Sequence, residues 1–515
     1  MVPADAAVMA STEGQAAERE VLRTALKASL PDYMVPAHLL FLAKLPLTAN
    51  GKLDRRALPQ PDASLLQAAY VAPQSELEQQ IAAIWADVLK LERVGLDDNF
   101  FELGGDSIVS LQVVGKARQA GVQFTPKQLF QHQTVQGLAT VARRVVEGIG
   151  EQGPITGSTP LTPIQQWFFE ADIGERGHWN QSILLTPSEP LQADRLHDAL
   201  LALVAHHDAL RLGFEQQAGA WQAEYKPQHQ ARILWEHACA DEEALSALAD
   251  QAQRSLNLQQ GLLVRALLAS LPDGSQRLLL VIHHLAVDGV SWRLLLEDLQ
   301  QAYQALGNRQ PVQLPAKTSA YKTWAQHLQA YAQSEALQAE LAYWQAQLQG
   351  TSDHLPCANA QGGNQQQHAA SVSTRLGREA TRQLLHDAPA AYRTQINDLL
   401  LTALARVIAR WTERPEVLVR LEGHGREDLF DDIDLSRTVG WFTSMYPVKL
   451  SPLGGIAESI KAVKEQLRAV PNKGLGYGAL KYMGPAGARE ALAALPQGEI
   501  VFNYLGQFDG SFDEQ

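Results

Sequence analysis

Two adjacent histidines followed by an aspartate are the residues of this chain whose spacing best suits acid–base chemistry. They lie in residues 281–293 (VIHHLAVDGVSWR), after an apolar run that predicts a buried strand. Successive side chains of a strand point to opposite faces, so His283 and His284 cannot both face one site. One is therefore a candidate base that titrates near neutrality, and the other is expected to pack. Asp288 follows within one short loop, before an amphipathic helix.

Two later stretches place polar groups at the ends of apolar strands. Glu422 and Arg426 lie among glycines in residues 422–427 (EGHGRE), and a solvated charge run is the ordinary explanation of such a segment. Gly-His-Gly is an unusual composition for solvation alone, which favours a functional role. Asn503 and Tyr504 end a second strand, and an amide and a phenol can both donate hydrogen bonds to a developing negative charge.

A serine at the start of a predicted helix is a further candidate. Residues 98–108 (DNFFELGGDSI) predict a tight turn that leaves Ser107 at the helix N-terminus. A capping role is the alternative on spacing alone, but a phosphodiester would also be stabilised by the positive end of the helix. A second histidine pair, residues 206–207, ends an amphipathic helix and is expected to cap or pack.

The composition limits the class of protein. The chain has 515 residues, 46% hydrophobic and 19% charged, which predicts a globular protein of three or four folding units. A net charge of −13 makes nucleic acid an unexpected partner. Cys239 and Cys357 lack neighbours at metal-ligand spacing, so neither a metal site nor a disulfide framework is predicted. No signal peptide or membrane-spanning run is visible, and a cytoplasmic location with no membrane partner is expected.

Linkers at residues 59–75 and 148–162 divide the chain into three units. The middle unit has a four-helix pattern, whose last helix is expected over residues 135–146. The last unit mixes helices and short strands, and two α+β halves could pack side by side in it. The expected boundaries are 1–62, 70–148 and 155–515, with the last unit split into lobes at about 155–335 and 336–515.

The first two units resemble parts of non-ribosomal peptide synthetases. Residues 30–36 (LPDYMVP) and 50–55 (NGKLDR) resemble the end of an adenylation domain, in which Lys52 would contact an acyl-adenylate. The substrate-binding part that should precede this remnant is absent from the chain. Residues 98–108 resemble the peptidyl carrier motif, and this resemblance implies that Ser107 carries a 4′-phosphopantetheine arm.

The last unit resembles the epimerisation domains of the same synthetases. The resemblance is carried by residues 283–293, 392–400, 422–427, 437–446 and 502–506. It implies a multidomain protein with an α+β adenylation remnant, an all-α four-helix carrier domain and an α/β, two-lobed fold similar to chloramphenicol acetyltransferase. The activity that it implies is inversion of the Cα of an L-aminoacyl or peptidyl thioester on the carrier.

The resemblance also implies roles for individual residues. His284 is the catalytic member of its pair and Glu422 is its counterpart, because inversion needs an acid and a base at one carbon. Asp288 is expected to hold the loop by pairing with Arg293 or with backbone. The side chains expected to support Glu422 or an enolate are those of Arg426, Asn503 and Tyr504.

Two alternatives remain open. A condensation domain shares the fold and the His-His-x-x-x-Asp-Gly core but forms a peptide bond, and residues 291–293, 422–427 and 502–506 argue against it. A catalytically incomplete carrier or docking fragment is the other alternative, because the family continues beyond Gln515 and the C-terminal end is expected to be truncated. The expected partners are a phosphopantetheinyl transferase, the upstream adenylation core and a downstream condensation domain.

Overall fold

The computed structural model describes most of the chain from residue 70 to residue 504. The undescribed positions within this range are 102, 106, 145–149, 229–231, 353, 358, 360–361, 364, 393 and 431, and before it only residues 22, 41–42 and 44 are described. The predicted adenylation remnant, with Lys52, therefore lies almost entirely outside the described residues. None of the helices in the described part is both long and apolar enough to cross a membrane.

The carrier unit is a small helical domain with a core of its own. Its elements are α3 (Glu76–Leu89), α4 (Ser107–Gln119), β1 (Val122–Gln123), α5 (Pro126–Gln131), α6 (Val135–Ala139) and β2 (Arg143–Arg144). Trp85 and Phe100 are fully buried at its centre, with ring centroids 5.1 Å apart. Aromatic side chains of this size contribute a large share of the buried apolar area in so small a domain.

The last carrier helix is shorter than the sequence predicts. We expected a helix over residues 135–146, but α6 ends at Ala139. The N–H of Thr140 bonds to carbonyls only two and three residues back, which tightens and closes the last turn. The chain then extends, and β2 pairs antiparallel with β1. Pairing with a strand distant in sequence has outweighed the helical apolar pattern here.

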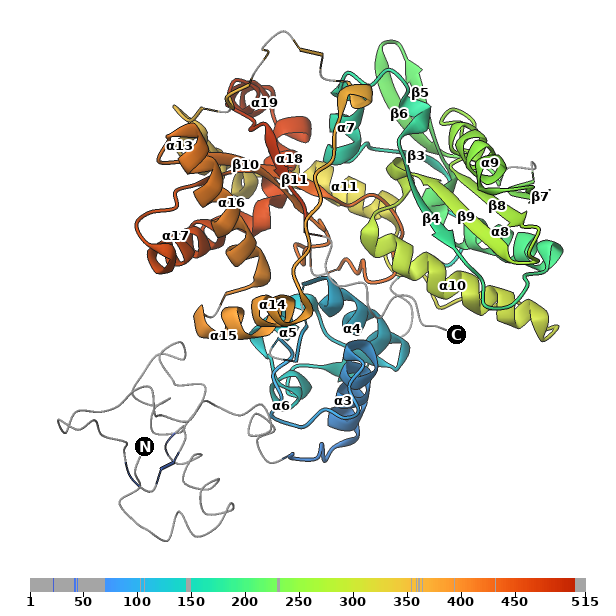
Figure 1. Ribbon diagram of the computed structural model, residues 1–515, viewed down its shortest axis with the longest axis horizontal. Helices are drawn as coiled ribbons and strands as arrows, with labels where there is room; N and C mark the ends of the chain where they lie inside the picture. The colour runs from blue at the N-terminus through green and yellow to red at the C-terminus, as the bar shows by residue number, and fades with distance from the viewer. Residues whose placement is uncertain are drawn as a thin grey trace.

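The first lobe is built on a four-stranded mixed sheet of order β4-β9-β8-β7 (Figure 1). Its elements are β3 (Gly157–Thr159), α7 (Pro163–Glu170), β4 (Asn180–Leu185), α8 (Ala193–His206), β5 (Leu212–Gln217), β6 (Ala220–Tyr225), β7 (Leu234–Ala238), α9 (Glu242–Arg254), β8 (Val264–Ser270), β9 (Gln276–His283), η5 (His284–Ala286) and α10 (Gly289–Gly307). Leu280 and Ile282 of β9 pack in the main core, and Leu279 and Val281 pack under α9. Burial on both faces explains why the strand reads as a continuous apolar run.

The second lobe contains a three-stranded sheet of order β11-β10-β12. Its elements are α11 (Tyr321–Ala332), α12 (Glu335–Gln338), α13 (Leu341–Leu348), α14 (Arg378–Arg382), α15 (Ala388–Tyr392), α16 (Ile396–Thr412), β10 (Val417–Gly423), β11 (Ser444–Leu450), α17 (Ile456–Arg468), α18 (Leu475–Gly478), η9 (Ala479–Met483), α19 (Ala486–Ala493) and β12 (Ile500–Phe502). The strand β10 is central, antiparallel to β11 and parallel to β12.

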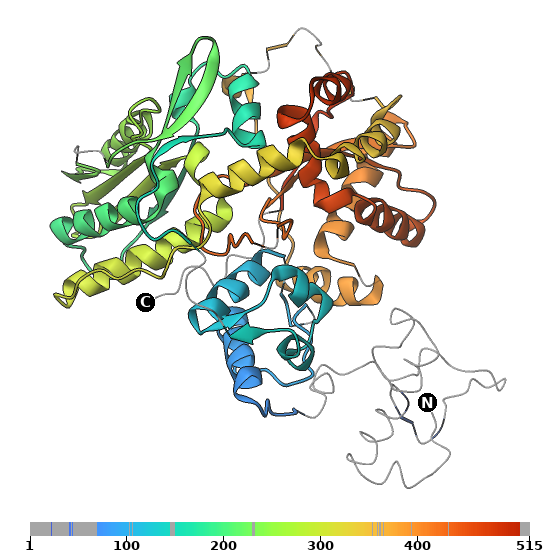
Figure 2. The same cartoon turned by 180° about the vertical axis from the view of Figure 1, so that it is seen from behind.

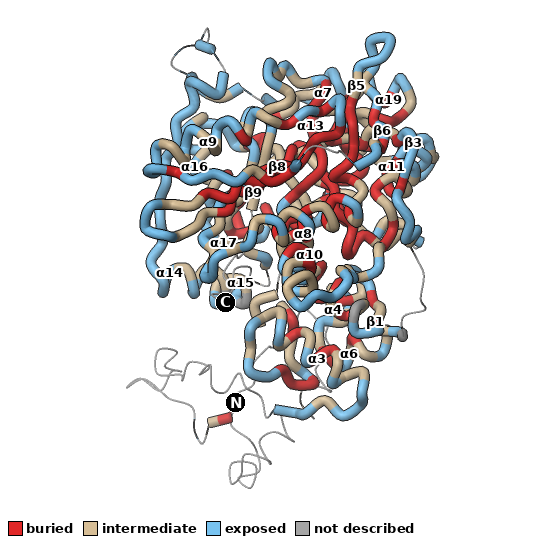
Figure 3. The backbone as a smooth tube through the Cα atoms, turned by 90° about the vertical axis from the view of Figure 1, so that its right-hand side faces the viewer, coloured by how far each residue is buried: buried red, intermediate tan, exposed pale blue. Residues whose placement is uncertain are grey.

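One buried apolar cluster runs through both lobes, from Ile155 to Leu492, while the carrier core is separate. The buried segments gather in the two lobes and in the centre of the carrier (Figure 3). The two lobes stand side by side, and the carrier lies below them (Figures 1 and 2). The lobes thus share a core, whereas the carrier meets them only at its surface.

The carrier contacts the loop between β10 and β11, residues 424–443, which we call the crossing loop. Arg118 of α4 forms an ion pair with Asp434, and the backbone N–H of Lys127 donates to Asp428 at 2.8 Å. The ammonium of Lys473 lies 4.8 Å from the ring centroid of Phe130. These contacts are polar and partly exposed, so they suit a surface that docks and releases.

Charge reversal in this contact gives a first prediction. The variant Asp434→Arg should separate the carrier from the lobes, because it faces Arg118 with a like charge. The measurement is amide hydrogen exchange over residues 113–131, together with the radius of gyration from small-angle scattering.

The swapped double variant Arg118→Asp with Asp434→Arg should restore the protection, since it returns opposite charges to the pair. Asp432→Arg is the matched control, because the described partner of Asp432 is His327 of the second lobe. Unchanged exchange in Asp434→Arg would contradict the contact.

Candidate active site

His283 and His284 separate at the end of β9, as strand alternation predicts. The His283 side chain is fully buried, and its Nε2 lies 2.7 Å from the carbonyl oxygen of Arg176. Burial lowers the pKa of His283 to about 4, so its ring is neutral at pH 7. His283 therefore packs, and His284 begins the short helix η5 with its ring beside Gln181 and Trp441.

Hydrogen bonds fix the tautomer of His284. Its Nδ1 lies 2.8 Å from the carbonyl oxygen of Val287, which can only accept, so Nδ1 carries the proton. Nε2 is then the basic atom, and the Nε2 amide of Gln181 donates to it at 3.0 Å. The indole of Trp292 donates to the amide oxygen of Gln181 at 2.8 Å, which orients that amide. Burial lowers the pKa of His284, and its neutral form is thereby favoured.

Gln181 is a site residue that sequence reasoning missed. It lies on β4, where the antiparallel register sets Gln181 opposite Ile282 and Asn180 opposite His283. A single polar residue at the start of an apolar strand carries no distinguishing signal in one sequence. Only the pairing of β4 with β9 places its amide beside the His284 ring.

Glu422 comes from the other lobe, near the end of β10. Asn503, just after β12, donates to its Oε2 at 2.7 Å, because the parallel register aligns the two strands. Burial raises the pKa of Glu422, and the charge of Arg420 opposes this shift. Tyr504 follows Asn503 directly. The predicted association of Asn503 with Glu422 is thus present in the structure.

Arg426 does not lie where we expected. Its Nη2 donates to both carboxylate oxygens of Asp288, at 2.9 and 3.1 Å, and its Nη1 donates to the carbonyl oxygen of Thr438 at 3.0 Å. The sequence prediction paired Asp288 with Arg293 or backbone and assigned Arg426 to Glu422. The structure corrects the assignment of Arg426, since a partner 138 residues away in sequence cannot be read from local spacing. The backbone pairing expected for Asp288 is present, because its carboxylate accepts from the N–H groups of Ser291 and Phe442.

Asp288 also holds the helix that follows it. It is the N-cap of α10, and its Oδ1 accepts from the backbone N–H and the hydroxyl of Ser291, both at 2.8 Å. Its Oδ2 accepts from the backbone N–H of Phe442 at 3.1 Å. A carboxylate with this many donors is fully satisfied in a buried site. Asp288 therefore joins the start of α10 to the end of the crossing loop.

The glycines around His424 have a steric explanation. Gly425 has φ +68°, and the carbonyl of Phe442 occupies the space that a Cβ would need. A Cβ on Gly423 would lie 2.8 Å from the hydroxyl oxygen of Ser444. The Gly-His-Gly composition thus reflects the close approach of the crossing loop to its own far end.

Two more contacts hold the crossing loop against the first lobe. Arg437 pairs with Asp298 of α10, and His207 Nε2 lies 2.8 Å from the other carboxylate oxygen of Asp298. The predicted packing role of residues 206–207 agrees with this arrangement. Trp441 places its indole on the His284 ring, with centroids 4.3 Å apart. Together these contacts place the crossing loop of the second lobe against His284 of the first lobe.

Ser107 is the first residue of α4, and the turn before it is closely packed. Gly104 has φ +101°, and the ring of Phe100 fills the position that a Cβ on Gly105 would take. The turn therefore requires glycine at both positions. A 4′-phosphopantetheine phosphodiester fits this place, because the N-terminus of a 13-residue helix stabilises a negative charge.

Removal of Arg426 gives a second prediction. Arg426→Ala should lower the free energy of unfolding by about 3–5 kcal/mol, because it leaves the buried Asp288 carboxylate without its cation. Urea unfolding followed by tryptophan fluorescence measures this change. Arg254→Ala, which breaks the exposed pair with Asp250, is the control and should cost less than about 0.5 kcal/mol. Equal costs for both variants would show that the buried pair does not hold the lobes.

Comparison with known families accounts for both described units. Residues 79–142 match the family described as phosphopantetheine attachment site, which indicates a covalently attached 4′-phosphopantetheine. Residues 155–515 match the family described as condensation domain.

Curated relatives belong to peptide synthetases. One protein of the linear gramicidin synthase of Brevibacillus parabrevis is 48% identical over 98% of this chain, which covers 7% of that protein. Surfactin synthase subunit 1 of Bacillus subtilis (strain 168) is 42% identical over 98% of this chain, which covers 14% of that protein. The chain thus spans a small part of each relative.

Solved structures agree in fold. The epimerization domain from the third module of tyrocidine synthetase B is 38% identical, with a TM-score of 0.67, 70% of this chain covered and 84% of that chain. The X-domain from teicoplanin biosynthesis has a TM-score of 0.55 at 20% identity, with 70% and 78% covered, which is a likeness of fold alone. The chain therefore belongs to the condensation-domain family of non-ribosomal peptide synthetases and carries a phosphopantetheine-attachment domain ahead of that domain.

Proposed function

We propose that the two-lobed domain inverts the Cα of an L-aminoacyl or peptidyl group tethered to Ser107, with His284 and Glu422 as the acid–base pair. The observation that carries the proposal is that His284 of one lobe contacts Trp441 and Glu422 of the other is the strand partner of Met445, and Trp441 and Met445 line one cavity. Burial lowers the pKa of His284 and raises the pKa of Glu422. The 38% identity with a solved epimerization domain also supports it.

The proposed chemistry is a proton exchange at one carbon. The attached arm supplies a thioester, which acidifies the Cα proton of the acyl group. His284 Nε2 takes this proton and the electron pair moves to the carbonyl oxygen, while the carboxylic acid of Glu422 returns a proton to Cα. In the reverse direction the carboxylate of Glu422 removes the proton and the imidazolium of His284 returns it.

The surrounding residues position these groups. Gln181 orients the ring of His284 by donating to Nε2. This hydrogen bond uses the lone pair that accepts the Cα proton, so it breaks before the proton is transferred. Asn503 orients the Glu422 carboxyl group from its other side. Asp288 and Arg426 act farther out, by fixing the loop that places Trp441 on His284. They are positioning residues in this proposal.

Loss of either member of the pair gives a third prediction. The full chain, loaded at Ser107 with an L-leucyl group, should exchange its Cα proton with solvent deuterium and yield a mixture of L and D isomers. His284→Ala and Glu422→Gln should each slow the exchange by at least about 100-fold, the low end of what one general acid or base contributes.

Mass spectrometry of the released amino acid measures the exchange, and chiral chromatography measures the isomers. His237→Ala is the matched control, because His237 is exposed on β7. A new amide with an acceptor carrier, without deuterium uptake, would support the condensation alternative. If the chain forms neither product, the result would support the alternative of a catalytically incomplete docking fragment.

The pH dependence gives a fourth prediction. In the active form, His284 and Glu422 together carry one titratable proton. Burial moves the pKa values of the two groups toward each other. Exchange should therefore fall at low pH, where both groups are protonated and no base remains, and fall at high pH, where no acid remains. Hydroxide also catalyses the exchange at high pH. Its contribution is measured with the double variant His284→Ala with Glu422→Gln and is subtracted from the rate of the unchanged protein. A corrected rate that rises steadily with pH would contradict the shared proton.

A further inference from the structure

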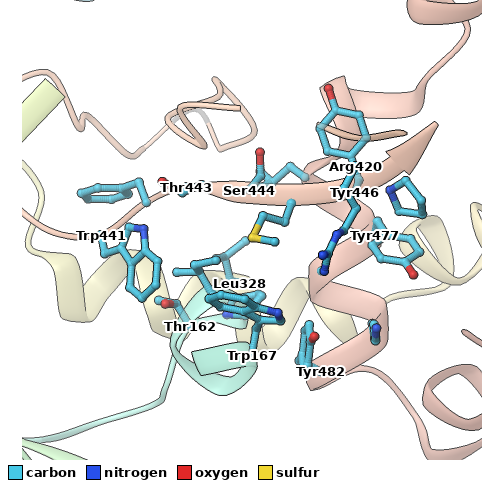
Figure 4. A pocket seen from close by; sticks show the side chains of 18 of the residues that line it. Thr162, Trp167, Leu328, Arg420, Trp441, Thr443, Ser444, Tyr446, Tyr477 and Tyr482 are labelled. Carbon is cyan, nitrogen blue, oxygen red and sulfur yellow. The ribbon is translucent and has the colours of Figure 1, made fainter. Parts of the chain in front are cut away.

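A cavity opens beside the candidate catalytic pair, between the two lobes. It has a volume of about 730 Å³ when the space continuous with solvent is included. It lies among α7, α11, β11 and the segment α18–η9, and Figure 4 displays most of its lining. Its lining includes Trp167, Trp441, Met445, Arg420, Lys481 and Tyr482.

One end of the cavity adjoins both candidate catalytic residues. Trp441 lines it and lies against the His284 ring. Met445 also lines it, and the antiparallel register pairs Met445 directly with Glu422, which puts both on one face of the sheet. A carbon held between His284 and Glu422 would therefore direct its substituents into this cavity.

The other end of the cavity carries positive charge. Arg420 lies on the same strand face as Glu422, two residues earlier, and its side chain lies at the end of the cavity away from Trp441 (Figure 4). Its Nε is buried and has no hydrogen-bond partner among the described residues. A buried donor without an acceptor is costly unless a ligand supplies one.

Lys481 adds a second cation at this end. Its ammonium bonds to the amide oxygen of Gln497 at 2.6 Å and lies 5.4 Å from the ring centroid of Tyr482. Burial lowers the pKa of Lys481, and the charge of Glu170 opposes that shift. In the described part of the chain no carboxylate forms a salt bridge with Lys481 or Arg420. Both cations are therefore available to an oxygen acceptor on a ligand.

The spacing sets the length of that ligand. Arg420 and Glu422 are two residues apart on β10, and two residues of a strand span roughly 7 Å. An extended peptide advances about 3.3–3.6 Å per residue. A main-chain carbonyl one or two residues before the reacting Cα would thus reach the guanidinium, while a single leucyl group would offer no acceptor there.

We propose that this cavity binds the peptide preceding the reacting residue, and that Arg420 and Lys481 select peptidyl substrates by donating to a carbonyl oxygen of that peptide. The inference rests on the proposed function and names its substrate class. Trp167 and Trp441 pack against the chain near Cα, and the two cations bind its carbonyl at the far end. A carboxylate side chain is the other possible source of an acceptor at this distance.

The test compares three acyl groups on Ser107 of the full chain: leucyl, alanyl-leucyl and glutamyl. Arg420→Gln and Lys481→Gln should each slow deuterium exchange of the alanyl-leucyl group by about tenfold or more, the effect of one charge-assisted hydrogen bond. Exchange of the leucyl group should change by less than about twofold. Lys461→Gln, which removes an exposed cation of α17, is the matched control and should leave all three rates unchanged.

A binding measurement separates this inference from the proposed function. Loading with alanyl-leucyl, but not with leucyl, should slow amide hydrogen exchange over residues 475–483, and Arg420→Gln should abolish that protection. Protection without Cα exchange would retain the cavity assignment and refute the epimerase. Cα exchange of the leucyl group without this protection would refute the cavity assignment alone.

The pattern of rates can also overturn the inference. Equal losses for all three acyl groups would mean that the cations act on the fold or on the catalytic pair. A loss confined to the glutamyl group would assign the cavity to an acidic side chain and refute the peptidyl assignment.

Discussion

The buried contact between Asp288 and Arg426 is the interaction on which the arrangement of this molecule depends. It joins the first turn of α10 in one lobe to the crossing loop of the other, and Phe442 donates to the same carboxylate. Burial lowers the pKa of Arg426 and the neighbouring Asp288 opposes that shift, while further donors satisfy both oxygens of the Asp288 carboxylate. The loop that the pair holds ends with Trp441 on the ring of His284.

The crossing loop thereby connects three parts of the molecule that are distant in sequence. It begins just beyond Glu422, touches the carrier through Asp428 and Asp434, and ends at Trp441. Carrier docking and the positioning of the two proposed catalytic groups thus share a single segment. A displacement of the docked carrier would act on the same loop that holds Trp441 against His284.

Burial acts in opposite directions on the two proposed catalytic groups. It disfavours the imidazolium of His284 and the carboxylate of Glu422, so one pKa falls while the other rises. Because the two pKa values shift toward each other, the driving force for proton transfer between the two groups falls, which suits a reversible inversion. The far end of the adjoining cavity differs, because Arg420 and Lys481 lie there without a carboxylate salt bridge among the described residues.

The sequence by itself determined the features that depend on near neighbours. Strand alternation separated His283 from His284, and the long motif around Ser107 located the carrier. The sequence pattern was wrong for the helix expected over residues 135–146, since pairing of β2 with β1 is a contact between distant segments. The tertiary structure alone decided that Arg426 binds Asp288, that Gln181 holds His284 and that Arg420 shares a cavity with Trp441. Each of these contacts joins strands or lobes far apart in the chain, and local spacing carries no information about which distant partner the fold brings near.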